Sequence, residues 1–287
     1  MMSLRIAYFG GEPLGAPILT ALIKAKHRPE LVVCNPDRPA GRGRKLTPPP
    51  TKMLASEHAI PVWQPTTLIP SPEELQGDWD LFVVVAYNKI LPAWLINIPK
   101  YKTINVHPSL LPKLRGASPV RSAILKNQKD AVGVTIMQMD AEMDHGPILA
   151  QAPVLIPMKD WPPTGPELDR ILIEKGSELL IQTIPDYIKG YIEPITQDHT
   201  AATYCGRLSK NMAELKLDPY KLPTGEAAHE TYRTIQAFIG IGYAWFMHNG
   251  VRYKITNAHL EGERLVVDTI VPANKKELAF GQVFNSN

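Results

Sequence analysis

Residues 103–112 read TINVHPSLLP, and they place Asn105 and His107 two positions apart at the end of a short apolar run. If residues 103–107 form a strand, its two-residue period puts both polar side chains on one face and the apolar ones on the other. Pro108 has no backbone N–H to give to a sheet, so the strand ends there. An amide and an imidazole at the carboxyl end of a strand suit a carbonyl group that becomes an oxyanion. The alternative is a buried pair that is bonded to nearby backbone.

The composition is that of a soluble globular protein, with 44% hydrophobic and 21% charged residues. A length of 287 residues favours two domains over one large domain. No apolar stretch is long enough to span a bilayer, and the start lacks the charged head and long apolar segment of a signal peptide. The two cysteines, Cys34 and Cys205, do not make a disulfide framework or a zinc site, which indicates the reducing cytoplasm.

The first part of the chain alternates strand-like and helix-like patterns, which predicts an α/β fold with an open, mostly parallel, Rossmann-like sheet. The run LFVVV at 81–85 is apolar without interruption, as expected of a strand that is covered on both faces. The expected strands lie at 4–9, 31–34, 81–85, 103–107 and 132–139, and the expected helices at 14–26, 49–58, 117–126 and 164–188.

The pattern changes after about residue 190. A helix is predicted at 226–238, and short strands at 244–248, 251–256 and 265–270. Asn249-Gly250 stands between two of these apolar runs, which is a strong signal for a hairpin. We therefore expect a small C-terminal β-barrel, OB-like and reduced, with domains at 1–190 and 207–287 and a linker at 191–206.

A cationic loop at residues 35–52 follows the second expected strand. Its positive side chains are Arg38, Arg42, Arg44, Lys45 and Lys52, against one negative side chain, Asp37. A long, mobile, cationic loop beside the carboxyl edge of a sheet suits a phosphate backbone; the alternative is a solvated surface loop. A nicotinamide site is not expected, because the nearby glycines Gly10, Gly11 and Gly15 do not have the G-x-G-x-x-G spacing.

A second loop follows the strand expected at 132–139 and carries three acids and a histidine. Asp144 is the candidate for chemistry, because Gly146 permits a tight turn that aims the carboxylate inward, where it could orient an imidazole or hold a water. The other polar residues, including Asp140 and His145, are expected to solvate or cap the loop. No partner with metal-ligand spacing stands near His145, so no metal is predicted.

Taken together, these motifs resemble those of the folate-dependent formyltransferases. The match is carried by Asn105, His107, Asp144 and residues 109–112, with further support from residues 36–43, 84–87, 134–140 and 203–210. The basic loop makes the chain more similar to the methionyl-tRNA formyltransferases than to the sugar-modifying members of the family. The resemblance implies the formyltransferase fold, 10-formyltetrahydrofolate as donor, and the amino group of methionyl initiator tRNA as acceptor, for translation initiation.

The resemblance and the charge pattern together imply a set of site residues. The expected catalytic residues are Asn105, His107 and Asp144. The expected donor-binding residues are Ala86, Tyr87, Asn88, Ile90, Leu91, Pro92, Ser109, Leu110, Leu111, Pro112 and Asp140. The expected tRNA-binding residues are Arg38, Arg42, Arg44, Lys45, Arg252, Lys254, Lys275 and Lys276. The expected partners are initiator tRNA and folate, without a membrane, and the chain is expected to be a monomer or weak dimer.

The implied reaction needs a neutral amine to attack the formyl carbon, although the pKa of an α-amino group is ordinarily about 8. Asn105 is expected to donate to the oxyanion of the tetrahedral intermediate. His107 is expected to donate as well, or to pass a proton to the leaving nitrogen. Asp144 is expected to orient His107 and to accept a proton through water.

The chain departs from the family pattern at several places, among them the following. Gly11-Glu12-Pro13 replaces a Gly-Thr-Pro turn, Asn88 replaces a glycine, and the C-terminal domain is expected to be short. Two rival functions stay open: formylation of an amino sugar nucleotide with the same donor and fold, and RNA binding by a decayed enzyme. The cations argue against the first rival, and the intact set of Asn105, His107 and Asp144 argues against the second.

Overall fold

The computed structural model describes residues 4–41 and 43–284, so the predicted cation Arg42 lies outside the described residues. The chain forms two compact units. The first takes in the chain up to Arg115, Ala131–Val154 and Asp169–Tyr204, and the second takes in Gly116–Asp130, Leu155–Leu168 and the chain from Cys205 onward. Each unit thus draws on several parts of the sequence, and the linear domain boundaries proposed above stay a prediction.

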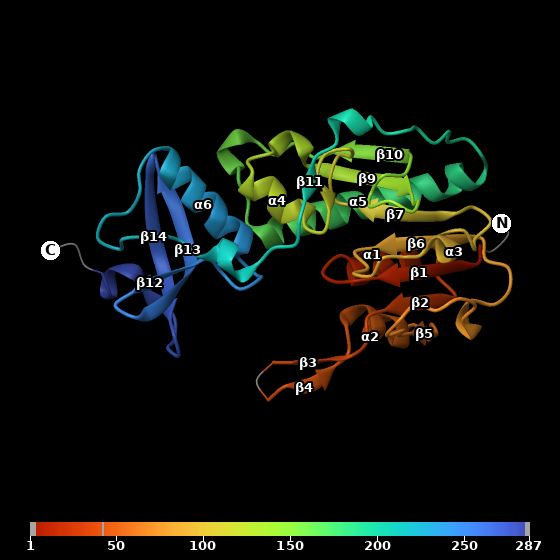
Figure 1. Ribbon diagram of the computed structural model, residues 1–287, viewed down its shortest axis with the longest axis horizontal. Helices are drawn as coiled ribbons and strands as arrows, with labels where there is room; N and C mark the ends of the chain where they lie inside the picture. Colours follow the sequence, from red (N-terminus) through yellow and green to blue (C-terminus); the bar gives the residue numbers. More distant parts are fainter. Residues whose placement is uncertain (1–3, 42, 285–287) are drawn as a thin grey trace. The chain divides into compact units, whose positions relative to one another are not determined.

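The first unit is built on a seven-stranded sheet (Figure 1). In spatial order its strands are β10 (Ile148–Pro153), β9 (Gly133–Gln138), β7 (Thr103–His107), β6 (Leu81–Val85), β1 (Ile6–Gly10), β2 (Leu31–Cys34) and β5 (Val62–Trp63). Neighbouring strands from β7 to β5 are parallel, whereas β9 runs antiparallel to both β7 and β10. The predicted open, mostly parallel sheet is confirmed, while β5 and β10 are strands that the sequence patterns did not predict.

The central strands are buried because their side chains are apolar on both faces. Every residue of β1, β2 and β6 is buried. Phe9 and Phe82 are both 0% exposed, and their ring centroids lie 5.3 Å apart. Burying an apolar side chain of this kind stabilises the fold by about 2–3 kcal/mol. This packed centre fixes the positions of the strand ends, from which the site residues project.

The helices that lie between or after the strands of this sheet along the chain include α1 (Gly15–Lys24), α2 (Pro50–Glu57), α3 (Ala93–Ile96) and α5 (Gly165–Ile188). Of these, α5 determines which face of β7 is open to the site. A Cβ atom placed on Gly176 of α5 would lie 3.3 Å from a Val106 methyl group and 3.4 Å from a Val134 methyl group. The helix therefore covers the face of the sheet that carries Val106. Because side chains alternate along a strand, Asn105 and His107 point to the other face.

The predicted basic loop contains a short hairpin, which corrects the expectation of an irregular, mobile loop. Strands β3 (Arg38–Ala40) and β4 (Lys45–Thr47) pair antiparallel. At its base, Lys52 Nζ lies 2.9 Å from both carboxylate oxygens of Asp37, and Gln64 donates to the same carboxylate at 2.8 Å. The Gln64 hydrogen bond first, and then that of Lys52, hold the pKa of Asp37 below its usual value. The cations of the hairpin therefore project from an anchored base.

The second unit contains a four-stranded antiparallel sheet and two helices that pack together. Its elements are α4 (Pro119–Leu125), α6 (Glu226–Phe238), β12 (Trp245–His248), β13 (Val251–Glu261), β14 (Arg264–Pro272) and β15 (Leu278–Ala279). Asn249 and Gly250 have φ of 46° and 73°, which is the geometry of the predicted tight hairpin turn. The expected small C-terminal β-structure is confirmed. Its strand order in the described residues is open, because four strands are too few to close around a packed interior.

No helix within residues 4–41 and 43–284 combines the length and the hydropathy that a membrane crossing requires.

Candidate active site

Strand β7 carries two predicted site residues to the carboxyl edge of the sheet. Asn105 is half-buried, and His107 is buried at 4% exposure. Strands β6 and β7 are parallel with Val84 opposite Asn105, so the loop after β6 leaves the sheet at the same edge. An amide, an imidazole and the loop from a neighbouring strand therefore meet where open parallel sheets place their ligands.

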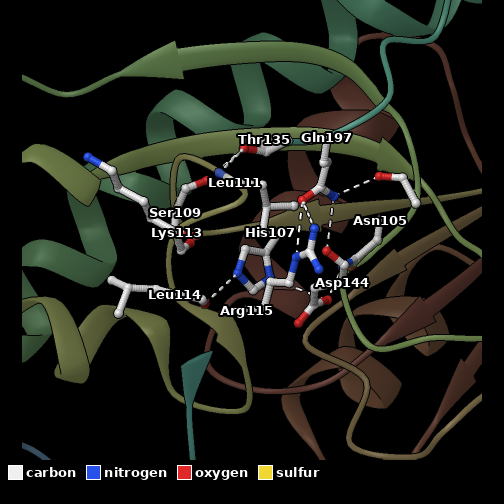
Figure 2. Close-up of polar contacts among 11 residues, drawn as sticks. Asn105, His107, Ser109, Leu111, Lys113, Leu114, Arg115, Thr135, Asp144 and Gln197 are labelled. Atoms are coloured by element: carbon white, nitrogen blue, oxygen red, sulfur yellow. Dashed lines mark hydrogen bonds and ion pairs between the residues drawn. The ribbon is translucent and has the colours of Figure 1, made fainter. Parts of the chain in front are cut away.

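Asp144 joins this pair from the loop that follows β9 (Figure 2). Asn105 Nδ2 lies 3.4 Å from Asp144 Oδ1, and His107 Nδ1 lies 3.5 Å from the same oxygen. Both distances exceed those of strong charge-assisted hydrogen bonds, so the three groups face one another without being locked together. Asp144 has a φ of 51°, in the left-handed region that favours glycine, so the contacts of its loop must hold it there.

The hydrogen bond of His107 assigns its tautomer. Its Nε2 atom lies 3.1 Å from the carbonyl oxygen of Leu114. A carbonyl oxygen can only accept, so Nε2 carries a proton and donates it. Nδ1 then faces the Asp144 carboxylate, and it is the ring nitrogen that can gain or lose a proton towards Asp144 and Asn105.

The loop after β7 is held by buried hydrogen bonds (Figure 2). The Ser109 hydroxyl donates to the Lys113 carbonyl oxygen at 2.6 Å, and the Thr135 hydroxyl donates to the Ser109 carbonyl oxygen at 2.7 Å. The backbone N–H of Leu111 donates in turn to the Thr135 hydroxyl at 3.1 Å. Of the predicted donor-binding run, Ser109 and Leu111 are buried, and Leu110 and Pro112 are half-buried. The Ser109 hydroxyl thus serves to shape the loop.

The loop after β6 carries most of the other predicted donor-binding residues. In this loop Tyr87 and Leu91 are buried, Ala86 and Pro92 are half-buried, and Asn88 and Ile90 are exposed. The hydroxyl of Tyr87 and the Oδ1 atom of Asn35 are buried with no hydrogen-bond partner among the described residues. Burial chiefly, and the nearby Cys34 thiol, raise the pKa of Tyr87 to about 12. Buried polar atoms without a partner near strand ends are ones that a polar ligand could satisfy.

Asp140, which was also predicted to bind the donor, makes its contacts within its own loop. One carboxylate oxygen lies 2.7 Å from His145 Nδ1, and the other accepts from the Glu142 N–H at 3.0 Å. The His145 ring stacks on His199, with centroids 3.9 Å apart and an interplanar angle of 4°. These contacts match the loop-capping role expected for Asp140 and His145, and they support the segment that carries Asp144.

Two buried residues beside Asp144 were not predicted from the sequence. Arg115 is 2% exposed and Gln197 is 4% exposed. Gln197 accepts a hydrogen bond from Arg115 at 2.7 Å and donates one to the carbonyl oxygen of Asp144 at 3.0 Å. The sequence showed Gln197 as one polar residue in a polar stretch, and that pattern carries no signal that this side chain is buried.

The predicted tRNA-binding cations fall into two groups, one in each unit. Arg38, Arg44 and Lys45 are exposed on the β3–β4 hairpin of the first unit. In the second unit Arg252, Lys275 and Lys276 are exposed, and Lys254 is half-buried. Arg252 lies over the Trp245 ring at 5.7 Å. Exposed cations on an ordered hairpin are available to a phosphate backbone.

Comparison with known proteins places the chain in a family. The family described as "Formyl transferase" matches residues 4–184. A methionyl-tRNA formyltransferase of Synechococcus sp. (strain JA-2-3B'a(2-13)) is 44% identical over 263 residues, which cover 89% of this chain and 77% of that protein. Another, of Sulfurihydrogenibium sp. (strain YO3AOP1), is 36% identical over 280 residues, with 96% and 86% covered. The match to that of Synechococcus sp. (strain JA-3-3Ab), at 45% identity, spans 66% of its length.

Solved structures share the fold at lower sequence identity. The sugar 3N-formyl transferase WlaRD, in the presence of dTdp and 5-N-Formyl-THF, has a TM-score of 0.65 at 21% identity and covers 92% of this chain and 88% of its own. HypX from Aquifex aeolicus in complex with tetrahydrofolic acid has a TM-score of 0.66 at 16% identity and covers 99% of this chain and 47% of its own. The chain belongs to the formyl transferase family and, within it, to the methionyl-tRNA formyltransferases.

Proposed function

We propose that the chain transfers a formyl group from 10-formyltetrahydrofolate to the amino group of methionyl initiator tRNA. The observation that carries this proposal is the convergence of Asn105, His107 and Asp144 at the carboxyl edge of the sheet. The similarity to methionyl-tRNA formyltransferases supports the acceptor, and the similarity to folate-bound structures supports the donor. We propose further that the protein acts in the cytoplasm as a monomer or weak dimer.

Asn105 has the chemistry to stabilise the charge that develops during transfer. When an amine adds to a formyl carbon, the carbonyl oxygen becomes an oxyanion within a tetrahedral intermediate. The Nδ2 amide of Asn105 points to the centre of the site and can donate to that oxygen. A donor of this kind lowers the barrier by about 3–4 kcal/mol when it is aimed at the position of the oxyanion.

His107 and Asp144 can move the proton that the reaction transfers. Because Nε2 of His107 already donates to Leu114, the proton-handling nitrogen in this proposal is Nδ1, 3.5 Å from Asp144 Oδ1. In this proposal His107 enters the reaction as the imidazolium, with a proton on both ring nitrogens; Asp144 accepts the proton that the attacking amine loses, and Nδ1–H of His107 donates to the leaving nitrogen. Passage of a proton from Asp144 to Nδ1 then restores the starting state of the pair.

Donor binding is proposed for the loop after β6. Tyr87 in this loop and Asn35 in the segment after β2 each bury an unsatisfied polar atom, as polar groups do where a heteroaromatic ring with donors and acceptors binds. The exposed Ile90 and the half-buried Pro92 offer apolar surface from the same loop. The donor supplies an electrophilic formyl carbon and a nitrogen leaving group.

A transfer assay with two acceptors tests the proposal. The purified protein is given 10-formyltetrahydrofolate with either methionyl initiator tRNA or an amino sugar nucleotide, and formylated product is measured. We expect formylation of the methionyl-tRNA alone. Formylation of the sugar alone would replace this proposal by the rival one, to which the structural neighbours at 20–22% identity lend only a common fold. Tight binding of tRNA without transfer to either acceptor would favour the decayed enzyme.

A further inference from the structure

Arg115 is a buried cation whose hydrogen-bond acceptors are neutral. Among the described residues, Arg115 is the largest side chain that is fully buried. Its guanidinium donates to Gln197 Oε1 at 2.7 Å and 3.1 Å and to His199 Nδ1 at 2.9 Å, with the Tyr204 hydroxyl at 3.5 Å. Within the described chain these acceptors are an amide, an imidazole and a phenol, and none of them is an anion. A buried charge without a counter-ion is destabilising, so its retention beside the site calls for a reason other than stability.

Gln197 connects this cation to the loop that carries Asp144 (Figure 2). Its orientation follows from its partners, because a guanidinium can only donate and a carbonyl can only accept. The Oε1 atom therefore faces Arg115, and the Nε2 group donates to the carbonyl oxygens of Asp144 at 3.0 Å and Gly146 at 2.7 Å. The Gln197 side chain thus binds two carbonyl oxygens of one turn, and the planar guanidinium of Arg115 fixes its orientation.

The turn needs such a hold because its own backbone does not favour this conformation. Asp144 has a φ of 51°, which is uncommon for a residue with a side chain. Gly146 packs closely, since a Cβ there would lie 2.1 Å from the Gln138 carbonyl oxygen. The Asp144 carboxylate lies 3.4 Å from Asn105 and 3.5 Å from His107, which is too long for either side chain to hold it firmly.

We propose that Arg115 and Gln197 are positioning residues, which hold the Asp144 carboxylate against Asn105 and His107 by binding the backbone of its turn. The inference rests on the proposed function, because it concerns the efficiency of the same transfer. The Asp144 carboxylate would shift if the two carbonyls lost their donor. A displacement of about 1 Å at such a position reduces turnover by roughly a hundredfold.

Gln197→Glu separates the two halves of this connection. A carboxylate can still accept from Arg115, and even more strongly, but it has no N–H group for the carbonyls of Asp144 and Gly146. We expect kcat to fall about tenfold to a hundredfold, while the KM values for donor and acceptor stay within about twofold. The control is Gln182→Glu, the same chemical change at an exposed position of α5, which should leave kcat and KM unchanged.

Repeating the substitution in an Asp144→Ala protein distinguishes a positioning role from a role in the stability of the fold. In an Asp144→Ala protein there is no carboxylate to position, so Gln197→Glu should change the residual kcat by less than about twofold. Arg115→Lys keeps the positive charge but loses the planar set of N–H donors. Its effect on kcat is also compared with and without the Asp144 carboxylate, and this variant replaces Gln197→Glu in the test if Gln197→Glu does not fold. A thermal melt establishes folding for each variant.

Wild-type protein in the same assay keeps the two proposals apart. If the wild type transfers no formyl group, the proposed function fails. If it does, then wild-type kcat in folded Gln197→Glu, or an equal loss with and without the Asp144 carboxylate, overturns the positioning role. Loss of the fold in both Gln197→Glu and Arg115→Lys would assign the pair to stability alone and would overturn it as well.

Discussion

At the scale of single residues, His107 shows how one backbone contact assigns a chemical role. The Leu114 carbonyl oxygen accepts a hydrogen bond from His107 Nε2–H at 3.1 Å, so Nδ1 is left to face Asp144. Had Leu114 instead contacted Nδ1, the ring would present Nε2 to the site. The division of work between the two nitrogens therefore depends on the loop after β7, because a free imidazole has no preference strong enough to set it.

Replacing Asn105 or His107 by Ala should reduce kcat by about a hundredfold or more, because each change removes a donor aimed at the reacting atoms. The donor dissociation constant should change far less, since neither residue belongs to the loop after β6. Single-turnover transfer and a donor titration measure the two quantities. As an internal check, the His107→Ala and Asp144→Ala effects should combine to less than their product, because the pair acts as a unit. Near-normal turnover in His107→Ala would remove this residue from the mechanism.

Cys34 should resist alkylation in the folded protein. Burial above all raises the pKa of its thiol from 9.0 to about 11, against a smaller opposing effect of Lys52. In a Cys205→Ala background, iodoacetamide at pH 8.5 should therefore label Cys34 slowly in buffer and rapidly in urea. Because the folded protein holds this proton more tightly than the unfolded chain, the free energy of unfolding should decline as pH rises from 9.0 towards 11. Equal labelling rates in buffer and urea would contradict this account.

At the scale of elements, the turn after β1 and the loop after β6 are fitted closely to each other. Gly11 N–H donates to the Val85 carbonyl oxygen at 2.9 Å. A Cβ on Gly11 would lie 1.9 Å from the carbonyl oxygen of Ala86. Because the clash is with backbone, it cannot be relieved by turning a side chain.

Gly11→Ala should therefore destabilise the protein by about 1–3 kcal/mol and weaken donor binding, as the loop after β6 is pushed away. Gly206→Ala is the matched control, since a Cβ there meets no atom within 4 Å. Urea denaturation of both variants gives the comparison, with a lower midpoint and an unchanged slope expected for Gly11→Ala. A Gly11→Ala midpoint equal to that of Gly206→Ala would show that the turn moves freely.

The β3–β4 hairpin should act on tRNA binding and leave the chemistry alone. Arg44→Ala and Lys45→Ala should each weaken tRNA binding and reduce the slope of log affinity against log salt by about one for each phosphate that is no longer bound. Both side chains are exposed, so the fold should be unaffected. Lys24→Ala, at an exposed position of α1, controls for the loss of one positive charge. Unchanged affinity and slope in the hairpin variants would leave it as a solvated surface element.

At the scale of the whole molecule, the two compact units do not follow the order of the chain. The segment Gly116–Asp130 contains α4 and belongs to the second unit, where α4 packs against α6. Deleting the C-terminal part of the chain would therefore remove α6 and leave α4, which lies far earlier in the sequence, without this packing partner.

Removal of residues 207–287 should leave the seven-stranded sheet folded, because its strands all precede the cut. It should also uncover α4 and raise the binding of a hydrophobic dye. Affinity for tRNA should fall by about tenfold or more, because the cations of the second unit are removed. Full-length Arg252→Ala with Lys276→Ala removes two of these charges without uncovering the helix. A truncated protein that binds initiator tRNA as tightly as the full chain would exclude the second unit from recognition.

Local sequence patterns were enough for five of the seven strands of the sheet, β1, β2, β6, β7 and β9, and for the Asn105–His107 pair. The apolar runs of β2 and β6 match their predicted bounds, since a strand buried on both faces leaves an uninterrupted apolar signal. The same-face geometry of Asn105 and His107 follows from the two-residue period of any strand. By contrast, β5 has only two residues and β10 includes exposed positions, so neither gave a clear pattern.

Only the tertiary structure decided the surroundings of Asp144. Arg115 and Gln197 are separated by 82 residues in the sequence, and Gln197 and Asp144 by 53, yet all three are joined by hydrogen bonds. Polar side chains have the same pattern in a sequence whether they are solvated or buried, because their burial depends on partners that other segments supply. The sequence by itself therefore determined which groups could do the chemistry, and the packing of distant segments determined how those groups are aimed and held.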